Sequence, residues 1–316
     1  MIAYHILCHG NFDQVALQIA ALYDPADTFL IDVDDGQAPD TRPVDRWLKK
    51  KNVHLVRDSN IGWGGGGTLR KTIRGAFALL DLDARWDYYI VLSGQDLPLK
   101  PRAAIRARLR SGLEHGRSFM RSARCEILDP AEMPTLNPNG ERCTLWGDRG
   151  HTKIYACPDT INPQSHMAAR WLVDITEVGQ KSEVYIDTAD TLLLERRRSF
   201  FERHPFHIGA NWFNLHRSLI EHMRSDPFAY ELYDILRTTF IPDESYFQTY
   251  VMNSPFHDRV VNDHTRLILR PGVKAGVKVF DMGDLDRIRA GDELFGRKFD
   301  MRKDRQIFDE VLRLAA

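Results

Sequence analysis

Along the first third of the chain, continuous apolar runs take turns with segments whose apolar residues recur at helical spacing. Compact apolar runs predict buried strands at residues 2–8, 28–31, 53–57 and 88–92. Apolar positions at helical spacing predict helices at residues 12–22, 44–50 and 68–82. Because strands and helices take turns, we expect an α/β fold whose mainly parallel sheet is flanked by helices on both faces.

Polar residues at the ends of the predicted strands are the first sign of a binding site. Ligands of open α/β sheets bind beyond the carboxyl ends of the strands. His9, Asp34, Trp63 and Asp96 fall at those ends, and Cys8 is the last residue of the first strand. The sequence therefore predicts a ligand site along this edge of the sheet.

The pattern becomes irregular in the middle of the chain and regular again after it. Prolines and glycines are frequent over about 119–206, which we interpret as an irregular insertion beside the site. Order returns with strand patterns at residues 208–213 and 277–280 and helical patterns at residues 218–223 and 305–315. No linker or internal repeat divides the chain, so we expect a single domain over 1–316.

The stretch Pro242-Asp243-Glu244 places two adjacent carboxylates before an apolar run. Proline suits the first turn of a helix, and apolar residues recur at helical spacing over 246–251. Both acids can be explained as first-turn residues that the helix dipole stabilises. In the alternative interpretation, Asp243 caps or orients the helix while Glu244 points into a cleft as a general base.

Composition and charge narrow the class of protein. The chain has 316 residues, is 43% hydrophobic and carries a net charge of −1, so no global field draws it to nucleic acid or to an anionic membrane. Its four cysteines form no CxxC pair or zinc spacing. A strand pattern begins at residue 2, and no apolar run reaches ~18 residues. We expect a soluble cytoplasmic protein without a transmembrane segment, and peripheral docking to a membrane stays open.

Four segments in order carry a resemblance to a known family. They are WGG at 63–65, SGQDLP at 93–98, PDESYFQT at 242–249 and FGRKFD at 295–300. Together they resemble the Core-2/I-branching enzymes, which include β-1,6-N-acetylglucosaminyltransferases and peptide O-xylosyltransferases. The resemblance implies a nucleotide-binding fold of the GT-A type and inverting transfer of GlcNAc or xylose from a UDP-sugar to a hydroxyl of a glycan or peptide. It also implies that no metal or other cofactor takes part.

The resemblance assigns roles to individual residues. Glu244 becomes the general base, and Arg297 and Lys298 become the cations that bind the diphosphate. The predicted donor-binding set is completed by Cys8, Asp34, Gly62, Trp63, Asn211 and Trp212, with Asp96 and Asp243 in support. The nucleotide-binding half then spans 1–118, the insertion supplies acceptor contacts, and the catalytic and diphosphate-binding half spans 207–316.

A second phosphate contact is harder to locate. Some relatives carry a further basic residue upstream of the Arg-Lys pair, and the matching position here is Ala275. Lys274 and Lys278 lie close to it in the sequence, so we predict that one of them, with Lys274 the first candidate, makes this contact.

The sequence also contains a DxD pattern, Asp32-Val33-Asp34, which binds metal in many nucleotide-sugar transferases. Its position after the second strand argues against that role, because in those enzymes the motif follows the later strand that ends here at 93–96. The resemblance instead implies that Asp34 holds the nucleoside by hydrogen bonds. We interpret Asp32 and Asp35 as turn residues before Gly36.

Two other classes of protein stay open. The loop at 62–67 satisfies GxGxxG between a strand and a helix, as in NAD(P)-dependent oxidoreductases. However, it follows the third strand, and the expected acid about 20 residues on is not at a strand end. Thr68 stands where a P-loop has lysine. The other alternative is a non-catalytic protein that binds a sugar nucleotide or glycan.

Overall fold

A computed structural model describes residues 1–59, 64–82, 85–124, 173–177, 184–188, 191–239, 241–270 and 276–316. The central element is a 7-stranded sheet in the order β12-β6-β11-β4-β1-β2-β3. Its strands are β1 (Ile2–Cys8), β2 (Thr28–Asp34), β3 (Val53–Asp58), β4 (Tyr88–Ser93), β6 (Ser118–Met120), β11 (Phe213–His216) and β12 (Val260–Val261). Only β11 runs antiparallel to its neighbours, so the predicted α/β fold with a mainly parallel sheet is confirmed.

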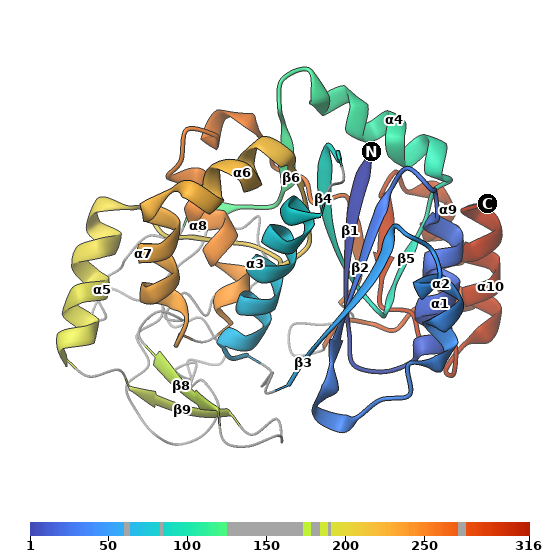
Figure 1. The fold of residues 1–316 in the computed structure, drawn as a ribbon, viewed down its shortest axis with the longest axis horizontal. Helices are drawn as coiled ribbons and strands as arrows, with labels where there is room; N and C mark the ends of the chain where they lie inside the picture. Colours follow the sequence, from blue (N-terminus) through green and yellow to red (C-terminus); the bar gives the residue numbers. More distant parts are fainter. Residues whose placement is uncertain are drawn as a thin grey trace.

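Helices cover both faces of this sheet (Figure 1). The helices of the first half are α1 (Phe12–Leu22), α2 (Asp45–Leu48), α3 (Gly66–Asp81) and α4 (Arg102–Leu113). Side chains of β1 alternate between the faces, because Ala3 joins one buried cluster while Tyr4 and Ile6 join the other. Both faces are therefore apolar, as the continuous hydrophobic runs in the sequence predicted.

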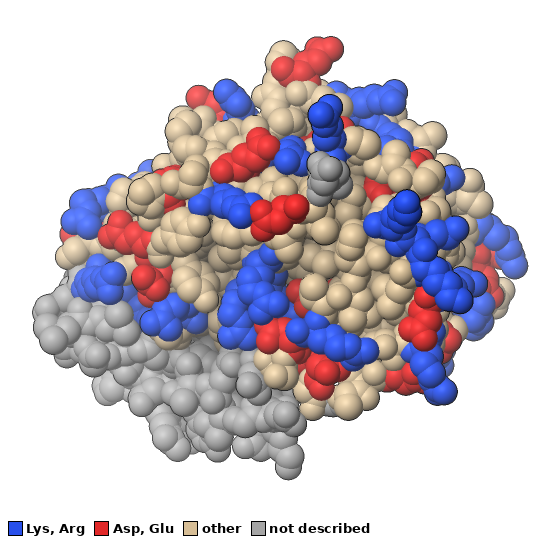
Figure 2. Space-filling view, in the orientation of Figure 1, with Lys and Arg blue, Asp and Glu red and all other residues tan. Residues whose placement is uncertain are grey.

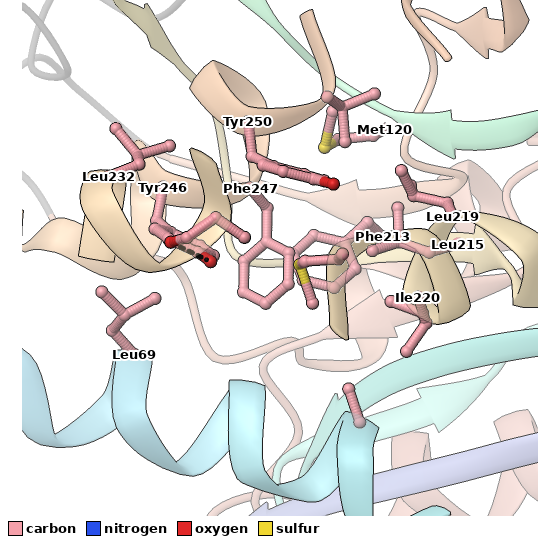
Figure 3. Close-up of a cluster of buried hydrophobic side chains, with 14 of the residues drawn as sticks. Leu69, Met120, Phe213, Leu215, Leu219, Ile220, Leu232, Tyr246, Phe247 and Tyr250 are labelled. Atoms are coloured by element: carbon pink, nitrogen blue, oxygen red, sulfur yellow. Dashed lines mark hydrogen bonds between the residues drawn. The ribbon is translucent and has the colours of Figure 1, made fainter. Parts of the chain in front are cut away.

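A layer of short helices carries the PDESYFQT stretch. It is formed by α5 (Thr191–Arg203), α6 (Arg217–Ser225), α7 (Pro227–Leu236) and α8 (Tyr246–Met252). Tyr246, Phe247 and Tyr250 of α8 point into a cluster with Leu232 of α7 and Leu69 of α3 (Figure 3). This burial fixes α8, and with it the turn that precedes α8, against the sheet and α3.

A second, 3-stranded sheet lies beside the first and has the order β13-β14-β5. Its strands are β5 (Asp96–Pro98), β13 (Arg266–Ile268) and β14 (Phe295–Arg297), and α9 (Leu285–Ala290) and α10 (Arg305–Leu314) follow β13 in the chain. Arg266 ties the two sheets together, since its guanidinium donates to the carbonyl oxygens of Val91 and Phe213 at 3.0 and 3.2 Å. Burial lowers the pKa of Arg266 to about 9.

The remaining strands are short or lie in the middle of the chain. They are β7 (Ala123–Arg124), β8 (Val173–Glu177), β9 (Val184–Thr188) and β10 (His207–Ile208). Most of the predicted insertion lies outside the described residues, and the division into one domain stays a prediction. None of the helices in the described ranges is long and apolar enough to cross a membrane.

Two strand predictions were wrong. The pattern at 208–213 predicted one strand, but β10 ends at Ile208 and β11 begins at Phe213, and the residues between them form a connecting segment. The pattern at 277–280 also predicted a strand, but no strand forms there. Lys278 N–H donates to the Leu269 carbonyl oxygen at 2.8 Å, and the stretch is bonded to Lys298 in both directions, since Lys298 N–H donates to the Lys278 carbonyl oxygen at 3.2 Å and Phe280 N–H to the Lys298 carbonyl oxygen at 2.8 Å. These bonds are divided between two neighbouring segments and do not continue into a strand ladder.

The interpretation of Asp32 as a turn residue was also wrong. Asp32 lies inside β2, is buried, and pairs with the equally buried Lys71 of α3 at 2.9 Å. Burial alone would raise the pKa of Asp32, but the hydrogen bond from His5 and the charge of Lys71 outweigh it and lower that pKa. Asp32 therefore anchors α3 to the sheet.

Candidate functional site

Arg297, the last residue of β14, is the most unusual side chain in the predicted site. It is only 7% exposed, and its guanidinium carbon lies 3.6 Å from the ring centroid of Trp212. Its Nε is 3.8 Å from Asp96 Oδ1, which is too long for a hydrogen bond. Nε and Nη1 have no hydrogen-bond partner among the described residues. A buried guanidinium with two unsatisfied donors is costly unless a ligand supplies the acceptors.

Charged groups of both signs surround Arg297. Burial lowers the pKa of Arg297, and the negative charges of Asp96 and Glu244 oppose that shift. The pKa of Lys298 is also lowered, first by burial and then by the positive charge of Arg297. Arg270 lies close enough to affect both residues. A group of cations that repel one another fits an anionic ligand.

Glu244 ends the 3₁₀ turn Pro242–Glu244, which directly precedes α8. The turn begins after Ile241, whose φ of 49° is left-handed and whose N–H donates to the Gly64 carbonyl oxygen at 2.7 Å. This bond ties the turn to the loop before α3. The prediction of a helix N-terminus is therefore right in outline, although Ser245 separates the turn from α8. Asp243 is buried and Glu244 is partly buried.

The segment 209–212, which connects β10 and β11, lies against this turn. The Gly209 N–H donates to the main-chain oxygen of Glu244 at 2.8 Å. Asn211 is 3% exposed, and its Oδ1 has no donor among the described residues. Trp212 follows and stacks on Arg297. The structure thus brings together Glu244, Trp212 and Arg297, three residues of the predicted site.

Asp96 is held from two sides. Its carboxylate accepts hydrogen bonds from the N–H and the hydroxyl of Ser93, both at 2.8 Å. Strand pairing sets Asp96 opposite Arg297, because β5 and β14 are antiparallel. In the described part of the chain, no three His, Cys, Asp or Glu side chains gather closely enough to hold a metal ion. The absence of a metal requirement stays a prediction.

Asp34 and Cys8 end the neighbouring strands β2 and β1. Asp34 is partly buried, and its carboxylate accepts a 3.1 Å hydrogen bond from the Gly36 N–H. The Cys8 thiol is buried against the carbonyl oxygen of Asp32, and burial raises its pKa to about 12. Both residues lie at the predicted edge of the sheet. However, the Cys8 thiol itself is turned inward.

The second phosphate contact now has a different candidate. Lys278 forms ion pairs with Asp281 at 3.1 Å and Asp284 at 2.8 Å, so its charge is already neutralised. Lys274 lies outside the described residues, as do Gly62 and Trp63 of the predicted donor site. Arg270, which sequence reasoning missed, follows β13 and acts electrostatically on both Arg297 and Lys298. Only the parallel pairing of β13 with β14 reveals this proximity.

The basic character of the site is local. Figure 2 shows acidic and basic side chains interspersed over one face of the molecule, in keeping with the net charge of −1. The site itself combines a carboxylate that can accept a proton with cations that can stabilise a departing anion. This pairing suits a group transfer in which a hydroxyl attacks and an anionic group leaves.

Comparisons with known proteins point to one family. A family model described as Core-2/I-Branching enzyme matches residues 2–126 and 175–274. Xylosyltransferase 2 of the dog (Canis lupus familiaris) is 23% identical over 286 residues, and that of the mouse (Mus musculus) is 24% identical over 278 residues. Each match covers 84% of this chain, which spans about a quarter (26%) of the length of these relatives.

One solved structure, mouse xyloside xylosyltransferase 1 in its apo form, is a weak structural match. The alignment covers 94% of this chain and 97% of that chain, at 12% identity and a TM-score of 0.35.

Proposed function

The chain belongs to the Core-2/I-branching enzyme family, and from this membership we propose that it moves GlcNAc or xylose from a UDP-sugar to a hydroxyl of a glycan or peptide acceptor. The relatives named xylosyltransferase make UDP-xylose the first donor to test. The single observation that carries the proposal is the buried Arg297 with two unsatisfied donors, which lies within electrostatic range of Glu244.

The diphosphate of the donor is the ligand that suits Arg297 best. Its oxygens accept hydrogen bonds in a bidentate manner and carry the negative charge that the cation group lacks. Lys298 adds a point charge, and Arg270 takes the place of the second phosphate contact that we first expected of Lys274 or Lys278. Burial lowers the pKa of Lys298 and the positive charge of Arg297 lowers it further, and a diphosphate here would counter that repulsion.

Glu244 is the proposed general base. It accepts the proton of the acceptor hydroxyl while that oxygen bonds to the anomeric carbon and the bond from that carbon to the diphosphate breaks. A single displacement of this kind inverts the anomeric centre. Arg297 and Lys298 stabilise the charge that develops on the departing UDP, which is the role a metal ion has in other transferases.

The other predicted residues support the donor. Asp34, at the end of β2, is the residue that we propose to hydrogen-bond the nucleoside. Asn211 offers a buried acceptor oxygen next to Trp212, in a segment where a sugar hydroxyl can supply the missing donor. Asp96 supplies a negative charge 3.8 Å from Nε of Arg297.

Thermal unfolding with a panel of nucleotides tests the donor. UDP-xylose, UDP-GlcNAc, UDP and NAD⁺ are each added to the wild-type protein, because a ligand that binds the folded state raises the melting temperature. We expect a shift with UDP and with one UDP-sugar. A shift with NAD⁺ alone would favour an oxidoreductase.

The variant Glu244→Gln tests the base. It keeps the size of the side chain but cannot accept the proton, so transfer should fall by about 10²–10⁴-fold while UDP still produces its thermal shift. Wild-type turnover in this variant would reject Glu244 as the base. Donor binding without any turnover in the wild type, over a broad acceptor panel, would favour a non-catalytic binding protein.

A further inference from the structure

Gln248 of α8 follows Glu244, which ends the turn before that helix, and its side chain is fully buried. Its side-chain Nε2 donates a 2.9 Å hydrogen bond to the carbonyl oxygen of Ala210. Nothing in the proposed chemistry above uses this side chain. We propose that Gln248 is a positioning residue that fixes the 209–212 segment and, through it, the placement of Glu244 relative to Arg297. The inference rests on the proposed function.

The 209–212 segment is clamped at its first residue. Gly209 donates to the main-chain oxygen of Glu244 at 2.8 Å. A Cβ atom at this position would lie 2.0 Å from the carbonyl oxygen of Arg121 and 3.0 Å from Cγ of Gln248, so no side chain fits. The main chain therefore runs between Arg121 on one side and α8 on the other, with Gln248 in contact at both Gly209 and Ala210.

The same segment reaches the cations within a few residues. Trp212 packs its ring under the guanidinium of Arg297 at 3.6 Å. Glu244 and Arg297 come from elements far apart in the sequence, and the 209–212 segment touches both. Because Gln248 bonds to the middle of this segment, loss of the bond frees Ala210, Asn211 and Trp212 to shift together. A shift of about 1 Å in a reacting geometry can lower a rate by roughly 10²-fold.

A neighbouring polar side chain, Asn253 at the C-cap of α8, serves as the control. Thr249 exchanges hydrogen bonds with the main chain of His207, each at 3.0 Å, and Asn253 Nδ2 donates to the Pro205 carbonyl oxygen at 2.9 Å. These bonds hold the start of β10 and do not reach residues 210–212. Asn253→Asp therefore removes a side-chain donor at the C-cap of the same helix, which serves the carbonyl oxygens of Pro205 and Thr249, and leaves the bond from Gln248 to Ala210 in place.

The test uses Gln248→Met, Gln248→Glu and Asn253→Asp in the full chain, with kcat and KM measured between about pH 6 and pH 9. Gln248→Met should lower kcat by roughly 10- to 100-fold at every pH, with a smaller change in the KM for the UDP-sugar.

Gln248→Glu introduces a buried carboxyl group. Burial raises the pKa of that group, and only its protonated form can donate a hydrogen bond to the Ala210 carbonyl oxygen. The kcat ratio of this variant to wild type should therefore rise as the pH falls. Asn253→Asp should show a constant ratio.

The results separate this inference from the proposed function. If the wild type is active and folded Gln248→Met has wild-type kcat, or if the Gln248→Glu ratio does not change with pH, Gln248 has no positioning role. Absence of turnover in the wild type rejects the proposed function instead. Crystal structures of wild type and Gln248→Met then test the geometry directly. We expect residues 210–212 to move relative to 242–244, and an unmoved segment overturns the inference.

Discussion

Replacement of Arg297 by methionine isolates the proposed contact to the diphosphate. The unsatisfied Nε and Nη1 atoms can form two charge-assisted hydrogen bonds with phosphate oxygens. A bidentate contact of this kind is worth about 3 kcal/mol, so the variant should bind UDP roughly 100-fold more weakly. The free energy of unfolding should change less than the free energy of UDP binding, because Asp96 keeps both hydrogen bonds from Ser93 and methionine can still pack on Trp212.

Isothermal titration with UDP at fixed ionic strength measures this loss. The matched control is Arg305→Met, which removes the same charge from an exposed arginine on α10 that pairs with Asp309 at 2.9 Å. The control should bind UDP like the wild type, since the charge it removes is exposed and screened by salt. If folded Arg297→Met binds UDP within about threefold of wild type, the diphosphate does not bind at Arg297 and the argument from its unsatisfied donors fails.

Three further predictions concern metal, stability and pH. Transfer should survive excess EDTA, as measured by UDP release, and complete loss restored by Mn²⁺ would return Asp34 or Asp96 to a metal role. Lys71→Met leaves Asp32 buried without its cation and should lower the free energy of unfolding in urea by about 3–5 kcal/mol. The control Arg74→Met, at an exposed position of the same helix, should lower it by less than about 1 kcal/mol. Equal effects would contradict the role of the buried pair. Burial lowers the pKa values of His207 and His264 to about 4, so the folded state keeps them neutral while the unfolded state binds protons near pH 6.5. Stability should therefore be complete above about pH 6.5 and fall towards pH 4, by up to about 2.7 kcal/mol per pH unit, and the double variant His207→Gln, His264→Gln should flatten this dependence.

Much of the main sheet could be predicted from the sequence. The apolar runs at 2–8 and 88–92 are long enough to show that both faces are buried, and they became β1 and β4. The pattern at 53–57 became β3, an edge strand in which only Val53 is buried. The helices at 12–22 and 305–315 were found because their apolar positions repeat over several turns. Such patterns are local, so one sequence is enough to reveal them.

The second sheet was missed because its strands have only three residues each. A period of two cannot be recognised over so short a stretch. Yet this sheet sets Arg297 opposite Asp96 and brings Arg270 near Lys298. The resemblance supplied Arg297 and Lys298, but pairing between distant segments was needed to find Arg270.

Asp32 shows the opposite problem, since a carboxylate close to a glycine has the local appearance of a turn residue. Its partners His5 and Lys71 lie on other elements, and their bonds to Asp32 make its burial tolerable. Likewise, Gln248 stood within the motif that carried the resemblance. However, its bond to Ala210 depends on how α8 packs beside β10. Long-range contacts of this kind leave no local pattern.

A crystal structure of the protein with UDP tests the central claim most directly. The account predicts diphosphate oxygens within about 3 Å of the Arg297 guanidinium and the Lys298 ammonium, with Glu244 facing the open side of the β-phosphate where the sugar is attached. A diphosphate bound at the glycine loop or through a metal on Asp96, away from Arg297 and Lys298, would contradict it.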